Sequence, residues 1–132
     1  SGANYLYGMM GNDTLDGGAG QDNLHGGPGA DRFVFSNAAH STAAAPDRIL
    51  DFSAASGDII DVSMVDANVG VAGDQAFAWV TSFTNTAGQV RAVYDAGQNR
   101  TVLEFDTDGD GQGDDMVIHV VGQVTSSAGF VL

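Results

Sequence analysis

Three aspartates recur at nine-residue intervals near the start of the chain, at Asp13, Asp22 and Asp31. They occupy the sixth place of three consecutive units, which align without a gap and read GMMGNDTLD, GGAGQDNLH and GGPGADRFV. Calcium binds six to eight hard oxygens in a tolerant geometry, and carboxylates together with backbone carbonyls of stacked turns can supply them. The spacing therefore predicts oxygen cages for several Ca²⁺ ions, with Asp13 and Asp31 sharing one of them.

The other places of each unit predict how these carboxylates are held. Glycine permits left-handed backbone angles and leaves carbonyl oxygens free to point inward. Places seven to nine form a short strand with one large apolar residue, so that successive units wind as a flattened coil and turns two units apart stack. A partial unit precedes the others and puts Asn4 beside Asp22. Asn4 and Asp22 are therefore predicted to share a second ion. A flexible glycine-rich linker is the alternative, which three copies in register disfavour.

Composition supports a cation-binding role. The chain of 132 residues carries a formal net charge of −13, and its acidic residues are all Asp except Glu104. Such a charge repels itself, so a bound cation would offset it. With four Arg and no Lys there is no basic patch for nucleic acid. Cysteine is absent, and no apolar run approaches the roughly 20 residues of a membrane span. The partial first unit suggests a piece of a longer protein.

The rest of the chain predicts short antiparallel strands. After a loop of small residues at 36–46, apolar residues alternate in period two over 47–52, 59–63, 77–82, 90–94, 101–105 and 116–121. Turn residues at 96–99 and 107–115 indicate hairpin connections. Helix signals are weak, with one short turn expected at 63–69. The sequence thus predicts two parts, a coil over 1–36 and an antiparallel β region over 37–132.

The segment GGPGADRFVFSNAAHSTAAAPDRILDF, followed by SGDIIDVSMVD, resembles the C-terminal RTX (hemolysin-type calcium-binding repeat) domain of serralysin-type secreted zinc proteases. Related modules occur on bacterial lipases and alginate epimerases. The resemblance implies an all-β fold, a calcium-bound parallel β-roll followed by an antiparallel β-sandwich. It also implies an upstream catalytic domain and an extracellular location, reached through type I secretion machinery that reads an uncleaved C-terminal signal.

By position, the resemblance implies that Asp13, Asp22 and Asp31 bind calcium together with the turn carbonyls around Gly8, Gly11, Gly17, Gly18, Gly20, Gly26, Gly27 and Gly29. It extends to two further carboxylates and leaves two departures. Asp51 and Asp58, in the PDxIxDF and DxID segments, are placed to close the last calcium site; a turn carboxylate at a strand end is the alternative for both. Met9 replaces the second glycine of the first unit, which is expected to loosen that turn. The tail SSAGFVL lacks the acidic residue that often precedes the terminal apolar residues of the export signal.

A second acidic segment begins as an EF-hand loop does, with Asp106, Asp108 and Asp110 followed by Gly. Its twelfth place is Val117, so the bidentate Glu is missing. The segment is either an additional calcium site or a solvated acidic turn.

Other residues give no catalytic constellation. The three histidines lack a zinc motif, no Ser lies in a GxSxG elbow, and the four Arg are expected to pair with carboxylates. Tyr5, Tyr7 and Trp79 could stack on sugars, although packing in the core and roll is the favoured role. The sequence thus predicts a non-catalytic module that folds on calcium outside the cell and stabilises an upstream enzyme domain. The alternative is a carbohydrate-binding (alginate) module, which the acidic surface disfavours unless calcium bridges the two.

Overall fold

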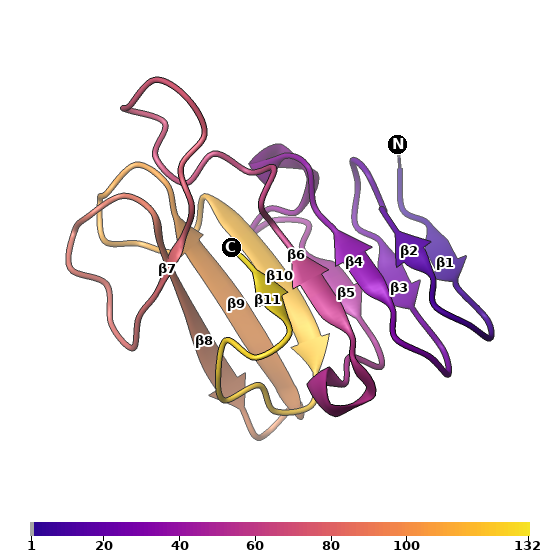
Figure 1. The fold of residues 1–132 in the computed structure, drawn as a ribbon. Coiled ribbons are helices and arrows are strands. Elements are labelled where there is room, and N and C mark those ends of the chain that lie inside the picture. Colours follow the sequence, from indigo (N-terminus) through magenta and orange to yellow (C-terminus); the bar gives the residue numbers. More distant parts are fainter. Residues whose placement is uncertain (1) are drawn as a thin grey trace.

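The computed structural model describes residues 2–132 and consists of two β-sheets packed face to face (Figure 1). The seven-stranded sheet has the order β1-β3-β5-β10-β9-β8-β7, and the four-stranded sheet the order β11-β6-β4-β2. The strands are β1 (Tyr5–Tyr7), β2 (Thr14–Leu15), β3 (Asn23–His25), β4 (Arg32–Val34), β5 (Asp47–Ile49), β6 (Ile59–Asp61), β7 (Ala78–Trp79), β8 (Gln89–Asp95), β9 (Arg100–Asp106), β10 (Met116–Val121) and β11 (Phe130–Val131). The predicted all-β fold, with parallel and antiparallel parts, is confirmed.

The nine-residue units form a parallel coil whose strands alternate between the two sheets. Leu6 of β1 lies beside Leu24 of β3 in one sheet, and Leu15 of β2 lies beside Phe33 of β4 in the other. Each neighbour is 18 residues away, which is two units, so the predicted flattened coil is confirmed. A single inward apolar side chain per strand fills the space between the sheets, because strand side chains alternate between faces.

Parallel pairing continues beyond residue 36. Leu24 of β3 lies beside Ile49 of β5, and Phe33 of β4 lies beside Ile60 of β6. The triplets Asp47-Arg48-Ile49 and Asp58-Ile59-Ile60 repeat the Asp-x-apolar end of the units, so they add one more winding to the coil. The predicted division at residue 36 therefore does not coincide with any change in strand pairing; the antiparallel part begins at β8.

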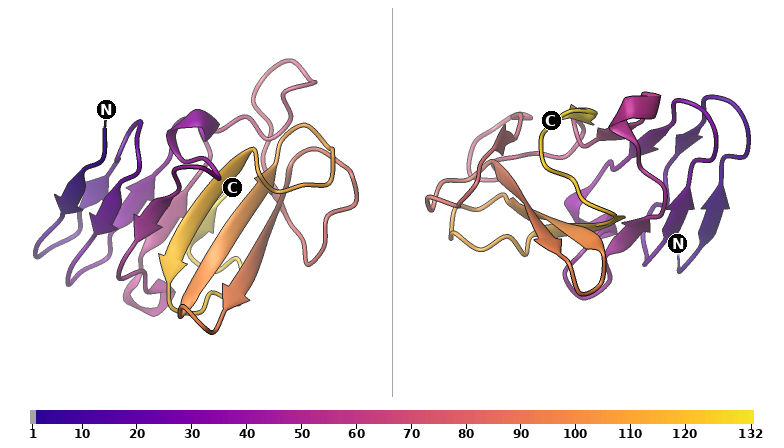
Figure 2. Two further views of the ribbon diagram at one scale, coloured as in Figure 1. Left: turned by 180° about the vertical axis from the view of Figure 1, so that it is seen from behind. Right: turned by 90° about the horizontal axis from the view of Figure 1, so that it is seen from below.

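The antiparallel part is joined to the coil through both sheets. β8, β9 and β10 form a meander, with the predicted turns at 96–99 and 107–115, while β10 also pairs in parallel with β5. β11, which the sequence did not predict, pairs in parallel with β6. Figure 2 shows the coil and the meander as one continuous body.

A few predicted elements differ from the structure. The segment 77–82 gives only β7, whereas the short turn expected within 63–69 is present. Short 3-10 helices occur at η1 (Ala38–His40) and η2 (Ala54–Ser56), and the side chain of Asn37 caps η1 by accepting the N–H of Ala39 at 2.9 Å. The core runs without interruption from Leu24 and Phe33 in the coil to Phe105 and Ile118 in the meander.

Candidate metal centre

The turns of the coil form two stacks, one on each side. On one side the backbone N–H of Asp13 donates to Oδ1 of Asp31 at 2.9 Å, and that of Asp31 donates to Oδ1 of Asp58 at 2.9 Å. Each aspartate thus accepts the N–H of the equivalent residue one winding earlier. The structure therefore brings Asp13 and Asp31 together, as the sequence predicts.

The other stack follows the same rule. The N–H of Asn4 donates to Oδ1 of Asp22 at 2.7 Å, and the N–H of Asp22 donates to Oδ1 of Asp47 at 2.8 Å. The predicted pair of Asn4 and Asp22 is also adjacent. Asp47 takes the aspartate place of the last winding on this side.

The second oxygen of four turn carboxylates is left without a partner. Oδ2 is buried and makes no hydrogen bond in Asp13, Asp22, Asp31 and Asp47. The whole side chains of Asp22, Asp31 and Asp47 are at most 1% exposed. Burying an ionised carboxylate without compensation costs several kcal/mol or more.

No side chain compensates these charges in residues 2–132. The ion pairs there join His25 to Asp51, Arg32 to Asp61 and Arg91 to Glu104, and none involves the four turn carboxylates. The pKa of Asp47 is accordingly raised to about 7: burial is the main cause, the hydrogen bond from the N–H of Asp22 opposes the rise, and the nearby charges of Asp22 and Asp16 add to it. The turns are thus short of positive charge.

The first glycine of each unit lies directly against the unpaired oxygen. A Cβ on Gly8 would lie 2.8 Å from Oδ2 of Asp13, and one on Gly17 would lie 2.7 Å from Oδ2 of Asp22. A Cβ on Gly26 would collide with Oδ2 of Asp31. Any side chain here would fill the space in front of the free carboxylate oxygen.

Glycines later in the turn lie against carbonyl oxygens of the preceding winding. At Gly27 and Gly29, both with positive φ, a Cβ would collide with the carbonyl oxygens of Met9 and Gly11. Carbonyl and carboxylate oxygens therefore crowd together without side chains between them. This is the hard-oxygen donor set that calcium prefers, and the residues present fit that ion.

Asp51 and Asp58 are used differently from the repeat aspartates. Asp51 accepts the N–H groups of Gly26 and Gly27 at 2.9 and 2.7 Å, and His25 Nδ1 lies 3.2 Å from its Oδ2. Asp58 accepts N–H groups from Asp31 and, at 2.8 Å, from Ser53. Both oxygens of each residue thus accept hydrogen bonds from backbone N–H groups of turns, as expected for a turn carboxylate at a strand end. Their role as ligands stays a prediction.

The loop after β9 brings together three aspartates, but they are not the three that the sequence predicts. Oxygens of Asp106, Asp108 and Asp115 lie within 4.8 Å of one another, whereas Asp110 accepts the N–H of Gln112 at 2.7 Å. Asp115, at the tenth place of the EF-hand-like loop, was missed because the pattern directs attention to Asp110 at the fifth place.

The carboxylates of this loop already have partners. The fully buried Asp106 accepts the N–H groups of Gly109 and Gly111 at 2.6 and 2.9 Å, and Asp115 accepts the N–H of Thr107 at 2.7 Å. Unlike the coil, the loop is closed by its own hydrogen bonds. A metal here stays a prediction.

Asp47 has a buried carboxylate oxygen without a partner like those of the repeat aspartates, but the sequence did not single it out. Its signal is the triplet Asp47-Arg48-Ile49, which repeats the pattern of the nonapeptides after an insertion that breaks the nine-residue spacing. Ser41 positions it: the Ser41 hydroxyl accepts the N–H of Asp47 at 2.8 Å and donates to the carbonyl of Val117 on β10 at 2.5 Å. The last turn of this stack is thereby tied to the antiparallel part.

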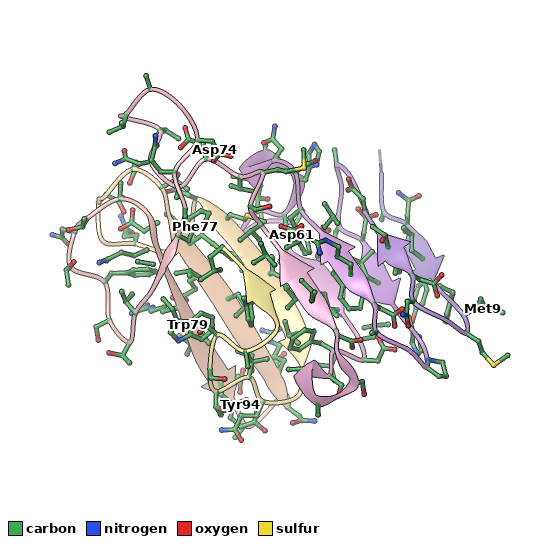
Figure 3. All side chains as sticks on the ribbon, viewed as in Figure 1. Met9, Asp61, Asp74, Phe77, Trp79 and Tyr94 are labelled. Carbon is green, nitrogen blue, oxygen red and sulfur yellow. The ribbon has the colours of Figure 1, made fainter. Side chains whose placement is uncertain are left out.

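Met9 keeps the conformation of the glycine that it replaces. Its φ is 80°, close to the 73° of Gly18 and the 97° of Gly27 at the same place of the following units. A left-handed conformation costs a residue with a Cβ about 1–2 kcal/mol. The side chain is exposed at the tip of the first turn (Figure 3).

The fold and the site together define a class of protein: an all-β module built on a parallel roll of glycine-aspartate turns. More particularly, the chain belongs to the family described as peptidase M10 serralysin C terminal, whose sequence model matches residues 8–132. This family is a non-catalytic part of larger enzymes, as the sequence predicts.

Among residues 2–132 no helix is long and apolar enough to cross a membrane.

Two longer proteins resemble the chain in sequence. It is 43% identical over 91 residues, 69% of its length, to metalloprotease AprA of Pseudomonas entomophila, and 35% identical over 100 residues, 76% of its length, to serralysin C of Dickeya chrysanthemi. It spans only 18% and 19% of these two proteins.

Two solved structures also resemble it, both subunits of the Azotobacter vinelandii mannuronan C5-epimerase. The AlgE6R3 subunit matches with a TM-score of 0.62 and 30% identity, over 98% of this chain and 73% of that one. The AlgE6R2 subunit matches with a TM-score of 0.66 and 26% identity, over 100% of this chain and 87% of that one.

Proposed function

We propose that this chain is a secreted calcium-binding module whose coil folds when calcium enters the turns. The observation that carries the proposal is the set of buried, unpartnered carboxylate oxygens of Asp13, Asp22, Asp31 and Asp47. Together with the turn carbonyls they would hold several calcium ions. The family membership and the donor chemistry both support this assignment.

Calcium would act here by neutralising charge. Without it, aspartates stacked one winding apart repel each other, and burial of their carboxylates opposes folding. At a calcium concentration ten times the Kd, each independent site adds about 1.4 kcal/mol to the free energy of unfolding. Several such sites are comparable with the whole stability of a small domain.

Folding of the coil would then support the rest of the molecule. β10 pairs with β5 and β11 pairs with β6, so the last winding provides strand edges for the meander and the C-terminal strand. In the low calcium of the cytosol the chain would stay unfolded and suited to type I export. Outside the cell it would fold and stabilise an upstream catalytic domain, a role that the likeness to metalloproteases supports.

Circular dichroism with and without millimolar calcium tests the proposal. We expect a β spectrum only with calcium, and a higher calcium midpoint in the Asp22→Ala and Asp31→Ala variants. Asp74→Ala is the matched control, because Asp74 is exposed in the loop before β7 and its removal changes the net charge equally (Figure 3). A β spectrum unaffected by calcium removal would contradict the proposal, and so would equal midpoints in all three variants.

A second candidate function is binding of an acidic polysaccharide such as alginate. The observation that favours it is the likeness, over 98% of the chain, to a subunit of a mannuronan C5-epimerase. Retention of the folded protein on an alginate affinity gel tests this function. The protein running through unretarded, once its fold has been verified, would exclude it.

A further inference from the structure

The outer face of the seven-stranded sheet gathers most of the few cations of this acidic chain. Of the four arginines, Arg48, Arg91 and Arg100 lie on strands of this sheet, on β5, β8 and β9. His119 of β10 lies directly beside Arg48, and Nη1 of Arg100 is 3.3 Å from Nδ1 of His119. The left view of Figure 2 faces the molecule from this side.

Two of these arginines have no carboxylate to pair with. Arg91 pairs with Glu104 at 2.6 Å, but Arg48 and Arg100 have no carboxylate oxygen within 4.0 Å among residues 2–132. The expectation that all four arginines pair with carboxylates is therefore wrong for this pair. It is notable in a chain with 17 acidic residues, where an ion pair is easily found.

The electrostatics around His119 confirm the local excess of positive charge. Burial lowers the pKa of His119, and the charges of Arg100 and Arg48 lower it further. A neutral His119 can accept a hydrogen bond from Arg100. Nε of Arg100 is buried and has no partner in the described part of the chain. The charge of Arg100 is therefore not offset by any carboxylate in residues 2–132, and an anion bound at the exposed part of its guanidinium group would offset it.

An exposed aromatic pair lies in the same row of the sheet. The register runs from Tyr5 through Asn23 and Arg48 to His119, on four adjacent strands spaced about 4.8 Å apart. Tyr5 and Tyr7 are 55% and 58% exposed, and their rings stack with centroids 4.9 Å apart. Both project from the outer face of β1, and Tyr7 also lies 5.2 Å from the ring of His25, so these tyrosines pack on the surface of the roll and not in the core.

We infer that this row, made of Tyr5, Tyr7, Arg48, Arg100 and His119, is the binding face for an acidic polysaccharide. The planar guanidinium groups match carboxylates, and the exposed tyrosine faces offer flat apolar surface to sugar rings. An acidic peptide would need pockets for apolar anchors, which an exposed aromatic row does not provide. The inference rests on the second candidate function and assigns it to particular residues.

Calorimetric titration with a hexamer of galacturonic acid tests the inference, on protein shown to be folded at a fixed free calcium concentration. Arg48→Gln and Arg100→Gln should each weaken binding about tenfold, as expected for loss of one charge-assisted hydrogen bond. Arg32→Gln is the matched control, because it removes the same charge from the four-stranded sheet, where Arg32 pairs with Asp61. It should leave the affinity within about twofold, the usual range for a distant surface charge.

The outcomes separate the site from the function. Wild-type protein that binds neither the hexamer nor the alginate gel would overturn both the second candidate function and this site, and binding to alginate alone would overturn this site. Wild-type binding that the two arginine substitutions leave unchanged would overturn the site alone, and would point to calcium bridging instead. Equal binding of poly-glutamate would overturn the polysaccharide as occupant. Loss of hexamer binding, but not of weak poly-glutamate binding, in Tyr5→Ala and Tyr7→Ala would support the sugar-stacking role.

Discussion

The parallel coil and the antiparallel meander share two sheets but bury different groups. Each complete coil strand buries one apolar side chain, such as Leu24 or Phe33, next to a buried aspartate. In the meander, β9 buries Leu103 and Phe105 at alternate positions, and β10 buries four apolar residues, Met116, Val117, Ile118 and Val120. The buried Asp106 of the meander accepts two backbone N–H groups, whereas the coil buries carboxylate oxygens for which residues 2–132 provide neither a hydrogen bond nor a counter-charge.

Truncation of the meander core should give the largest effect. Phe105 is fully buried and packs edge-on against Phe77 with ring centroids 5.0 Å apart. Phe105→Ala is expected to lower the free energy of unfolding by about 3–5 kcal/mol. Because no turn carboxylate is affected, the loss should be equal at every calcium concentration, as measured by urea unfolding across a calcium series.

The coil variant for comparison is Asp31→Asn. Each ion bound only by the folded state adds about 1.4 kcal/mol per tenfold rise in calcium above its Kd. Asp31→Asn should therefore reduce the slope of stability against the logarithm of calcium concentration, whereas Phe105→Ala shifts the line in parallel. Parallel lines for both variants would mean that the two regions do not differ in the way their burial suggests.

A pH series should give a smaller effect that is confined to the coil. The pKa of Asp47 is raised to about 7 in the folded chain, so calcium-free folded protein favours the protonated carboxyl. Protonation of Asp47 therefore adds to the free energy of unfolding at acidic pH. This addition is lost as pH rises towards 7, by roughly 2 kcal/mol between pH 5.5 and 7. Calcium requires the ionised form, so the gain in Tm on adding calcium should increase with pH.

Thermal unfolding in metal-free and calcium-containing buffers at four pH values measures this difference. Asp47→Asn is the control, because its amide does not titrate and should flatten the pH dependence. A calcium-induced gain in Tm that is the same at pH 5.5 and 7.5 would count against a protonated Asp47 in the calcium-free fold.

The smallest effect is expected at the tip of the first turn. Met9→Gly removes the left-handed strain of Met9 and should stabilise the calcium-bound protein by about 0.5–1 kcal/mol, after the entropy of glycine in the unfolded chain is deducted. Met10→Gly is the neighbouring control: Met10 is exposed and does not have positive φ, so the same change should destabilise. Chemical denaturation of both variants at saturating calcium gives the comparison, and a shift of equal sign would show that strain at Met9 is unimportant.

The sequence predicts the coil well because its register is local. Glycine and aspartate at fixed places define both the turn and the stacking partner 18 residues away, so the adjacency of Asp13 and Asp31 follows from spacing alone. Spacing does not predict the stacking partner of Asp47, because an insertion of small residues separates the last winding from the repeats. Only the hydrogen bonds of Ser41 across to β10 show how that insertion is folded back.

Features that depend on long-range packing were not predictable. β11 has two residues and no alternating pattern, and it forms because β6 offers it an edge. Asp115 joins Asp106 through the closure of a loop rather than through a motif. The unpaired Arg48 and Arg100 come together only when β5, β10 and β9 are neighbours in one sheet.

The pairing of β11 restricts how its residues could be bound by another protein. The N–H groups of Ile60 and Val62 donate to the carbonyls of Gly129 and Val131, at 2.7 and 2.9 Å, and the Phe130 ring lies 5.1 Å from that of Trp79. A receptor that binds residues 129–132 as an extended peptide would have to replace these contacts. Binding of this segment by such a receptor would therefore compete with its pairing to β6.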